Sequence, residues 1–219
     1  MSARDEILAR IRAATTDVPA AEPAAWSRAE DADPAVAYRL DSGQPGETVE
    51  RFADRAAEYR AHVTLLTDPA ELRTAVAAAL HRAGAAGAIA VPDDLPADWL
   101  PPGLGLLRAS DPTVAQLDAT AGAVTGCAAA IADTGTLVLD GGAHQGPRRL
   151  TLIPDLHVCV VRRAQIHASV PEAMRALEPS IRAGHPLTLV SGPSATSDIE
   201  LNRVEGVHGP RTLEIVVTP

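Results

Sequence analysis

Hydrophobic residues near the start of the chain recur at the spacing of a helix. Ile7, Leu8 and Ile11 fall on one face of a predicted helix over Ser2–Ala14. This face is narrow, and a short helix needs a partner surface to persist, so we expect it to dock on the body or on another chain. The following segment, Thr15–Gly46, is rich in Pro, Ala and Asp without periodicity, which is typical of an extended tether.

From Glu47 onward, helical stripes alternate with short apolar runs that indicate strands. Asp68, Pro69 and Glu71 are typical of a helix start, and Gly84 is typical of a helix end. Because this helix lies between two predicted strands, it indicates a parallel pair joined by a helical crossover. The predicted helices in this part cover residues 49–59, 68–84 and 112–117, and the predicted strands cover 62–66, 88–91 and 104–107.

The pattern changes after Ala123–Ile131, a run of small apolar residues. Three β-rich segments follow at short intervals, namely Thr136–Asp140, Leu150–Ile153 and His157–Val161. The Gly- and Pro-containing breaks between them leave no room for crossover helices, so we expect antiparallel hairpins. A helix over 169–184 and strands over 187–190 and 211–217 complete the predicted body.

This order of elements predicts one mixed α/β domain behind an N-terminal arm. We place the arm at residues 1–46 and the domain at residues 47–219. Aromatic residues make up only 2% of the chain. The core must therefore consist of Val, Leu, Ile and Ala.

Charge and cysteine content exclude several classes of function. The formal net charge is −9 without a basic stripe, which argues against nucleic-acid binding through phosphate contacts. The two cysteines, Cys127 and Cys159, form neither a disulfide framework nor a metal-finger spacing, and an iron–sulfur cluster usually needs about four. No segment approaches the roughly 18 apolar residues of a membrane span, and the N-terminus lacks a signal-peptide core. We expect a cytoplasmic protein.

The main candidate site is Ser191–Pro210. Ser191, Gly192 and Ser194 follow directly on a predicted strand, where backbone N–H groups and hydroxyls can bind an anion. His208 stands in a glycine-flanked turn and is a candidate acid–base group. Further polar residues between them are Thr196, Ser197, Asp198 and Glu200, whose two carboxylates can orient a histidine or take a proton. The alternative interpretation is that the segments around Ser191 and His208 are two plain turns without a functional role.

Other segments offer weaker candidates. Thr134, Gly135 and Thr136 form a turn signal between apolar segments, and a simple hairpin turn is the alternative. The loop around His144 leads into Arg148 and Arg149, so it can act as a lid whose arginine meets a carboxylate, or it is only a long connection. His157 and Cys159 share a strand face, but no third or fourth metal ligand stands at a telling distance, so we predict no metal site.

These segments carry a resemblance to a known family. TGTLVLD (134–140), RRLTLIPDLHVCVV (148–161) and SGPSATSDIE with GVHGP (191–210) resemble the lactate-utilisation protein C family, or LUD domain. The resemblance spans most of the chain and is strongest from Thr134 onward. It implies a Rossmann-like α/β domain with a mixed sheet and an antiparallel insertion, similar to the ribose-phosphate isomerase, glucosamine-phosphate deaminase and coenzyme A transferase group.

The resemblance also implies a role in oxidising L-lactate to pyruvate. In that system three proteins act together, and the other two carry the cysteine motifs for iron–sulfur clusters. We therefore expect no cofactor on this chain and iron–sulfur proteins as its partners. The candidate catalytic groups in these segments are His208, Asp198 and Glu200. The candidate substrate contacts are Thr134, Gly135, Thr136, Ser191, Gly192, Ser194, Thr196 and Arg149.

Three functions stay open from the sequence. In the first interpretation the chain is a component of a lactate-oxidising complex, as an oxidoreductase subunit without its own redox cofactor. This interpretation ranks first because of the resemblance. Alternatively it is a non-catalytic assembly or regulatory subunit that docks through its N-terminal helix. The third interpretation is a separate enzyme on the isomerase-like fold, acting on a sugar phosphate or an acyl-coenzyme A with Glu200 as the catalytic carboxylate.

Overall fold

The computed structural model describes residues 3–14, 47–108, 110–196, 204–206 and 208–219. The chain divides into two units, residues 1–38 and residues 39–219. In the first unit, α1 (Ala3–Ala14) confirms the predicted N-terminal helix. The predicted tether over Thr15–Gly46 lies outside the described residues, so the proposed boundary at 46/47 stays a prediction.

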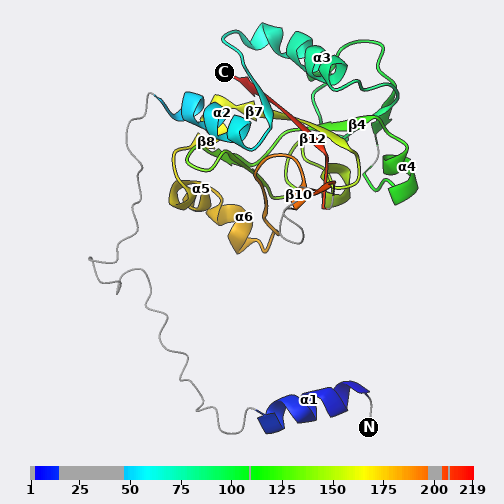
Figure 1. Cartoon of the computed structure of the whole chain (residues 1–219), viewed down its shortest axis with the longest axis vertical. Helices are drawn as coiled ribbons and strands as arrows, with labels where there is room; N and C mark the ends of the chain where they lie inside the picture. Colours follow the sequence, from blue (N-terminus) through cyan, green and yellow to red (C-terminus); the bar gives the residue numbers. More distant parts are fainter. Residues whose placement is uncertain (1–2, 15–46, 109, 197–203, 207) are drawn as a thin grey trace. The chain divides into compact units, whose positions relative to one another are not determined.

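The second unit is built around a six-stranded parallel sheet (Figure 1). Each pair of neighbouring strands in this sheet runs parallel, which requires crossover connections on its faces. In spatial order the strands are β1 (His62–Leu65), β12 (Thr212–Thr218), β7 (Leu156–Arg162), β4 (Gly122–Thr125), β2 (Ile89–Val91) and β3 (Leu106–Arg108).

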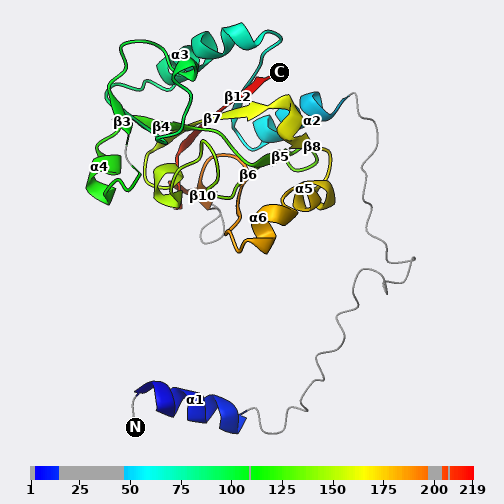
Figure 2. The same cartoon turned by 180° about the vertical axis from the view of Figure 1, so that it is seen from behind.

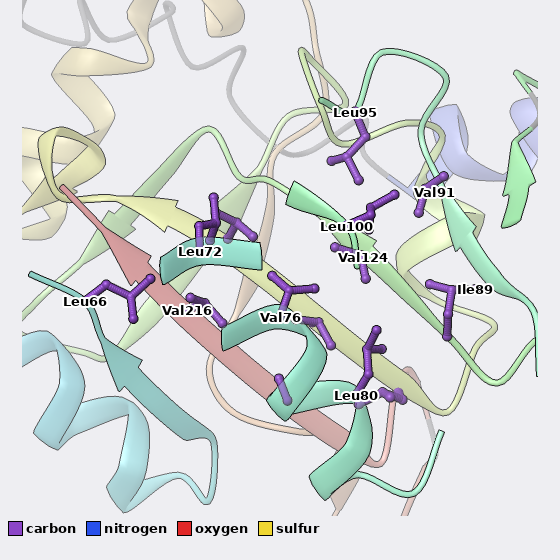
Figure 3. Close-up of a cluster of buried hydrophobic side chains, with 14 residues drawn as sticks. Leu66, Leu72, Val76, Leu80, Ile89, Val91, Leu95, Leu100, Val124 and Val216 are labelled. Atoms are coloured by element: carbon purple, nitrogen blue, oxygen red, sulfur yellow. The ribbon is translucent and has the colours of Figure 1, made fainter. Parts of the chain in front are cut away.

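One face of this sheet is covered by α3 (Leu72–Arg82). The helix follows the short 3-10 turn η4 (Pro69–Glu71), where the carboxylate of Asp68 accepts a hydrogen bond from Ala70 N at 2.8 Å, as the capping pattern predicts. Figure 3 shows Val76 and Leu80 of α3 packed toward Val216 and Val124 of the sheet. Aliphatic side chains therefore fill the space between α3 and this face of the sheet.

A second, four-stranded sheet packs against the other face. Its spatial order is β8 (Ile166–His167), β5 (Ala129–Ile131), β6 (Thr136–Leu139) and β9 (Thr188–Val190). The β5–β6 and β6–β9 pairs are antiparallel, whereas β5–β8 is parallel. Leu137 and Leu139 of this sheet share a buried cluster with Cys159 and Ile215 of the parallel sheet. The space between the two sheets is thus a second core.

Helices close the remaining surfaces of the body. α2 (Thr48–Glu58) places Phe52 in the core between the sheets. α5 (Val170–Ala176) and α6 (Glu178–Arg182) lie on the outer side of the mixed sheet, as Figure 2 shows from behind. The other elements are α4 (Val114–Asp118), the paired strands β10 (Ala195–Thr196) and β11 (Val204–Glu205), and the 3-10 turns η5 (Ala97–Trp99), η6 (Arg148–Thr151) and η7 (Arg163–Gln165). Among the described residues, no helix has the length and apolar character needed to cross a membrane.

The α/β class is confirmed, but two details of the prediction are wrong. The run His157–Val161 belongs to β7, which pairs in parallel with β12 and β4 instead of forming an antiparallel hairpin. Leu150–Ile153 was expected as a strand, yet its first residues complete η6, where Thr151 Oγ1 donates to the carbonyl oxygen of Arg148 at 3.1 Å. Among the described strands, all antiparallel pairs lie in the smaller sheets, and the four-stranded sheet is mixed.

Candidate functional site

Two adjoining cavities open where the edge strand β9 of the mixed sheet faces the parallel sheet. Their volumes are about 640 and 230 Å³. Arg148, Thr151 and Thr188 line both, so these three residues mark the junction between the larger and the smaller cavity. A pair of this size falls in the range of small-molecule sites.

The predicted motif Ser191–Ser194 forms one wall of the smaller cavity. Ser191, Gly192 and Ser194 all line it, and so does His208. Ser194 N donates to the carbonyl oxygen of Pro210 at 2.8 Å, and Ser194 Oγ accepts from His208 N at 2.9 Å. The structure therefore brings the serine-rich turn and the exposed His208 together, as the sequence indicated.

The second predicted motif lies behind this wall. Thr136 Oγ1 is 2.7 Å from Ser191 Oγ and 2.7 Å from Thr134 Oγ1, and Thr136 is buried. None of Thr134, Gly135 and Thr136 is among the described residues that line either cavity. The motif thus supports Ser191 from behind.

Both motifs use a glycine to contact the end of α2. A Cβ on Gly135 (φ +58°) would lie 2.4 Å from Ala56 N, and one on Gly192 (φ +74°) would lie 2.3 Å from the carbonyl oxygen of Tyr59. No side chain fits at these distances, and both φ values lie in the left-handed region that favours glycine. The two glycines therefore fix how closely the site packs on α2.

The structure distinguishes the two adjacent arginines. Arg149, the predicted substrate contact, forms an ion pair with Asp111 and is not among the described residues lining either cavity. Arg148 is the arginine at the junction, where its Nη1 donates to Thr151 Oγ1 at 3.0 Å. Partial burial lowers the pKa of Arg148 from its ordinary value. Nothing in the sequence shows which of the two faces inward.

His157 is a second site residue whose role the sequence did not reveal. It lines the smaller cavity although only 1% of its surface is exposed. Burial, and to a lesser extent the charge of Arg148, lowers its pKa to about 4, so the imidazole is neutral at pH 7. Its Nε2 lies 2.7 Å from Thr125 Oγ1, which donates to the carbonyl oxygen of Gly126 at 2.8 Å.

The hydrogen bonds of Thr125 are the basis for assigning a tautomer to this histidine. With the Thr125 hydroxyl proton placed on the carbonyl oxygen of Gly126, His157 Nε2–H is assigned as the donor to Thr125 Oγ1. The lone pair of the neutral ring then resides on Nδ1. Across the rest of the described chain, no group of three or more His, Cys, Asp or Glu side chains is arranged to hold a metal ion.

The loop around His144, for which the sequence left a lid and a plain connection open, is fastened at several points. His144 N donates to Asp94 Oδ2 at 2.8 Å, its Nδ1 lies 2.9 Å from the Asp94 carbonyl oxygen, and its ring meets that of Trp99 edge-on at 5.5 Å. At the start of the loop, the carboxylate of Asp140 accepts from Gly142 N, Gln145 Nε2 and Ser180 Oγ. Desolvation raises the pKa of Asp140, but these hydrogen bonds together lower it by more, so the pKa lies below its ordinary value. The loop is a rigid wall of the larger cavity.

The remaining predicted site residues are only partly placed. Thr196 lies in β10 and pairs with Val204 of β11. Asp198 and Glu200, predicted as catalytic carboxylates, lie outside the described residues. Their roles stay predictions.

Comparison with known proteins identifies the family. The sequence profile of the LUD domain matches residues 49–218, which is most of the chain. The chain belongs to the LUD-domain family. This LUD domain includes both cavities and both motifs described above.

Individual relatives agree with this assignment. The chain is 50% identical over 172 residues to the lactate utilization protein C of Deinococcus radiodurans, covering 78% of this chain and 79% of that protein. It is 37% identical over 92 residues to lactate utilization protein C 1 of Bacillus mycoides, covering 40% and 39%. Its fold matches the crystal structure of a DUF162 family protein from Deinococcus radiodurans with a TM-score of 0.70, at 42% identity, covering 81% of this chain and 99% of that one.

Proposed function

We propose that this LUD-domain protein is a component of a lactate-utilisation system. The observation that carries the proposal is the 50% identity to a lactate utilization protein C over more than three quarters of both chains. The cleft supports it, because a polar wall with a histidine and a cationic junction suits a small hydroxy acid.

The site residues take separate roles in this proposal. Oxidation of L-lactate to pyruvate releases two electrons and two protons, one from the hydroxyl group and one from C2. His208 takes the hydroxyl proton, with Asp198 or Glu200 orienting the ring, while the wall formed by Ser191, Gly192 and Ser194 holds the substrate. Thr196 and Thr134–Thr136 support that wall, and Thr136 does so through its hydrogen bond to Ser191.

Partner proteins take the electrons. We propose that these partners are the iron–sulfur proteins of the same system, which accept both electrons and the C2 proton, while this chain binds the substrate and takes the hydroxyl proton. The two cysteines of the chain are buried and free in the core between the sheets. In this proposal the redox centre belongs to the partners.

Growth on L-lactate tests the proposal. The full chain is expressed in a Deinococcus radiodurans strain that lacks its own lactate utilization protein C, and we expect it to restore growth. His208→Ala should abolish that growth, whereas His81→Ala, an exposed residue in the last turn of α3, should keep it. Failure of the wild-type chain, with the host's own gene restoring growth, would contradict the function. Wild-type growth with His208→Ala would contradict only the role of His208.

A further inference from the structure

Arg148 differs from Arg149 and Arg82 in its partners. Arg149 pairs with Asp111, and Arg82 forms a 2.6 Å contact with the buried carboxylate of Glu214. Arg148 has no carboxylate partner anywhere in the described part of the chain, although it lines both cavities. Its printed hydrogen bond is to the neutral hydroxyl of Thr151. The guanidinium therefore offers most of its donors to whatever enters the junction.

The chemistry of this junction favours a carboxylate. A guanidinium presents paired N–H donors in a plane that matches the two oxygens of a carboxylate. Thr188 lines both cavities and adds a hydroxyl group to the junction, while the hydroxyl of Thr151 is bonded to Arg148 itself. A cleft that partly excludes water strengthens the attraction between the two charges.

The larger cavity argues against a second negative charge on the ligand. Asp93, Asp94 and Asp140 all line it, so three acidic residues and a single arginine, Arg148, surround this cavity. His185 also lines this cavity, but an imidazole alone does not balance three carboxylates. A phosphate ester or a dicarboxylate would place further negative charge beside these groups, which costs free energy. The charges of the cleft thus select a monoanion.

The smaller cavity adds a hydrogen-bond acceptor. His157 lines it as a neutral ring whose Nε2–H is given to Thr125, so Nδ1 holds a lone pair. A ligand hydroxyl beside the carboxylate can donate to that nitrogen. Leu189, Val190 and Leu213 line the same cavity and provide an apolar surface for a short alkyl group.

We propose that the junction is a 2-hydroxymonocarboxylate site, in which Arg148 binds the carboxylate and His157 Nδ1 accepts a hydrogen bond from the hydroxyl group. The inference rests on the proposed function for its setting and specifies the ligand class of that same cleft. It assigns carboxylate binding to Arg148, outside the serine-rich motif. The hydroxyl group donates to His157 in the bound ligand, and His208 takes its proton only during the reaction. It also excludes sugar phosphates and acyl-coenzyme A as ligands.

Isothermal titration of the full chain tests the arginine. We expect Arg148→Met to weaken L-lactate binding roughly 10- to 100-fold, the usual range for loss of a charge-assisted hydrogen bond. Arg149→Met is the matched control, because its guanidinium pairs with Asp111, and it should bind like the wild type. Equal binding by Arg148→Met and wild type overturns the proposal, and so does absence of any lactate binding to the wild type.

The ligand series tests the histidine and the charge rule. Propionate, which lacks the hydroxyl group, should bind the wild type about tenfold more weakly than L-lactate. His157→Leu should erase this preference, and Thr125→Val, which removes the partner of Nε2–H, should reduce it if the first variant does not fold. Malate or inorganic phosphate binding more tightly than L-lactate overturns the monoanion assignment, as does a lactate preference that both variants retain.

The two proposals fail separately. Restored growth on L-lactate without lactate binding to the chain overturns the ligand assignment and leaves the proposed function standing. Lactate binding that depends on Arg148, without restored growth, overturns the proposed function and leaves the ligand assignment standing.

Discussion

The hydroxyl oxygens of Thr136 and Ser191 lie 2.7 Å apart although 55 residues separate them in the sequence. The pair continues the antiparallel register of β6 and β9, in which Leu137 stands opposite Val190. Thr136 is buried, so its hydroxyl depends on protein partners. The two motifs that the sequence offered separately therefore form one structural unit behind the smaller cavity.

A double-mutant cycle should detect this unit. Thr136→Val removes a buried hydroxyl that also donates to the Thr134 carbonyl oxygen at 3.3 Å, and we expect a loss of about 1–2 kcal/mol in the free energy of unfolding. Ser191→Ala should cost less, and the coupling between the two changes should be about 1 kcal/mol by urea denaturation. Strictly additive losses would show that the hydrogen bond does not stabilise the fold.

Gly192 should tolerate alanine much less than another left-handed glycine. Gly184 has φ +78° and open space where a Cβ would stand, so Gly184→Ala reports backbone strain alone, about 1 kcal/mol. Gly192→Ala adds a collision with the carbonyl oxygen of Tyr59 and should cost at least ~2 kcal/mol more in urea unfolding. Gly135→Ala should resemble Gly192→Ala. Similar losses at Gly184 and Gly192 would contradict the close approach to α2.

His157 should make stability depend on pH. Its pKa falls from 6.5 in the unfolded chain to about 4 in the fold, so between these values the unfolded state binds more protons. The contribution of His157 to the free energy of unfolding therefore rises with pH and is fully present above about pH 6.5. It declines by about 3 kcal/mol as the pH falls toward 4. Urea unfolding at a series of pH values measures this slope.

A matched pair of histidine variants isolates that effect. His157→Gln should flatten the pH dependence between 4 and 6.5, whatever it does to stability at pH 7. His185→Gln, which changes an exposed histidine in the same cleft, should keep the wild-type slope. The lowered pKa of Asp140 acts mainly below its ordinary value of 3.8, so Asp140 adds only a small slope at the acid end of this window. An unchanged slope in His157→Gln would contradict the assignment.

The loop over 141–147 should exchange its amide hydrogens slowly until His144 is removed. His144 has φ +63°, a strained value for a non-glycine residue, and its contacts with Asp94 and Trp99 hold it there. His144→Ala should speed exchange at Gly126 N, which donates to the His144 carbonyl oxygen at 2.7 Å, by about tenfold. Arg182→Ala, at an exposed pair with Glu178, serves as control. Fast exchange in the wild type would show a mobile lid.

Local signals in the sequence predicted the elements better than their pairing. Asp68 caps its helix, Ser169 accepts from Glu172 N at the start of α5, and both were readable from residue type and spacing. β7 was misassigned because short breaks before it suggested hairpins, whereas its partners β4 and β12 come from distant parts of the chain. Its nearly continuous burial is the signal for a strand covered on both faces, which is typical of parallel sheets.

The candidate site was also predictable only in part. The motif at Ser191 and the turn at His208 were predictable because glycine, serine and histidine cluster there, and Ser194 joins them. Arg148 was not predictable over Arg149, because two adjacent residues differ only in the direction that η6 gives them. His157 has no special sequence context either. Its character comes from burial and from Thr125, which lies on another strand.

The position of β12 has a consequence for how the protein folds. β1 stands at the edge of the parallel sheet and pairs with β12 alone. β1 is synthesised early, so it has no partner in that sheet until β12, a late strand, inserts between β1 and β7. During translation, the edges of β1 and β7 are unsatisfied templates for strand addition, which invites aggregation. We expect slow, late closure of the sheet and a strong dependence of yield on chaperones.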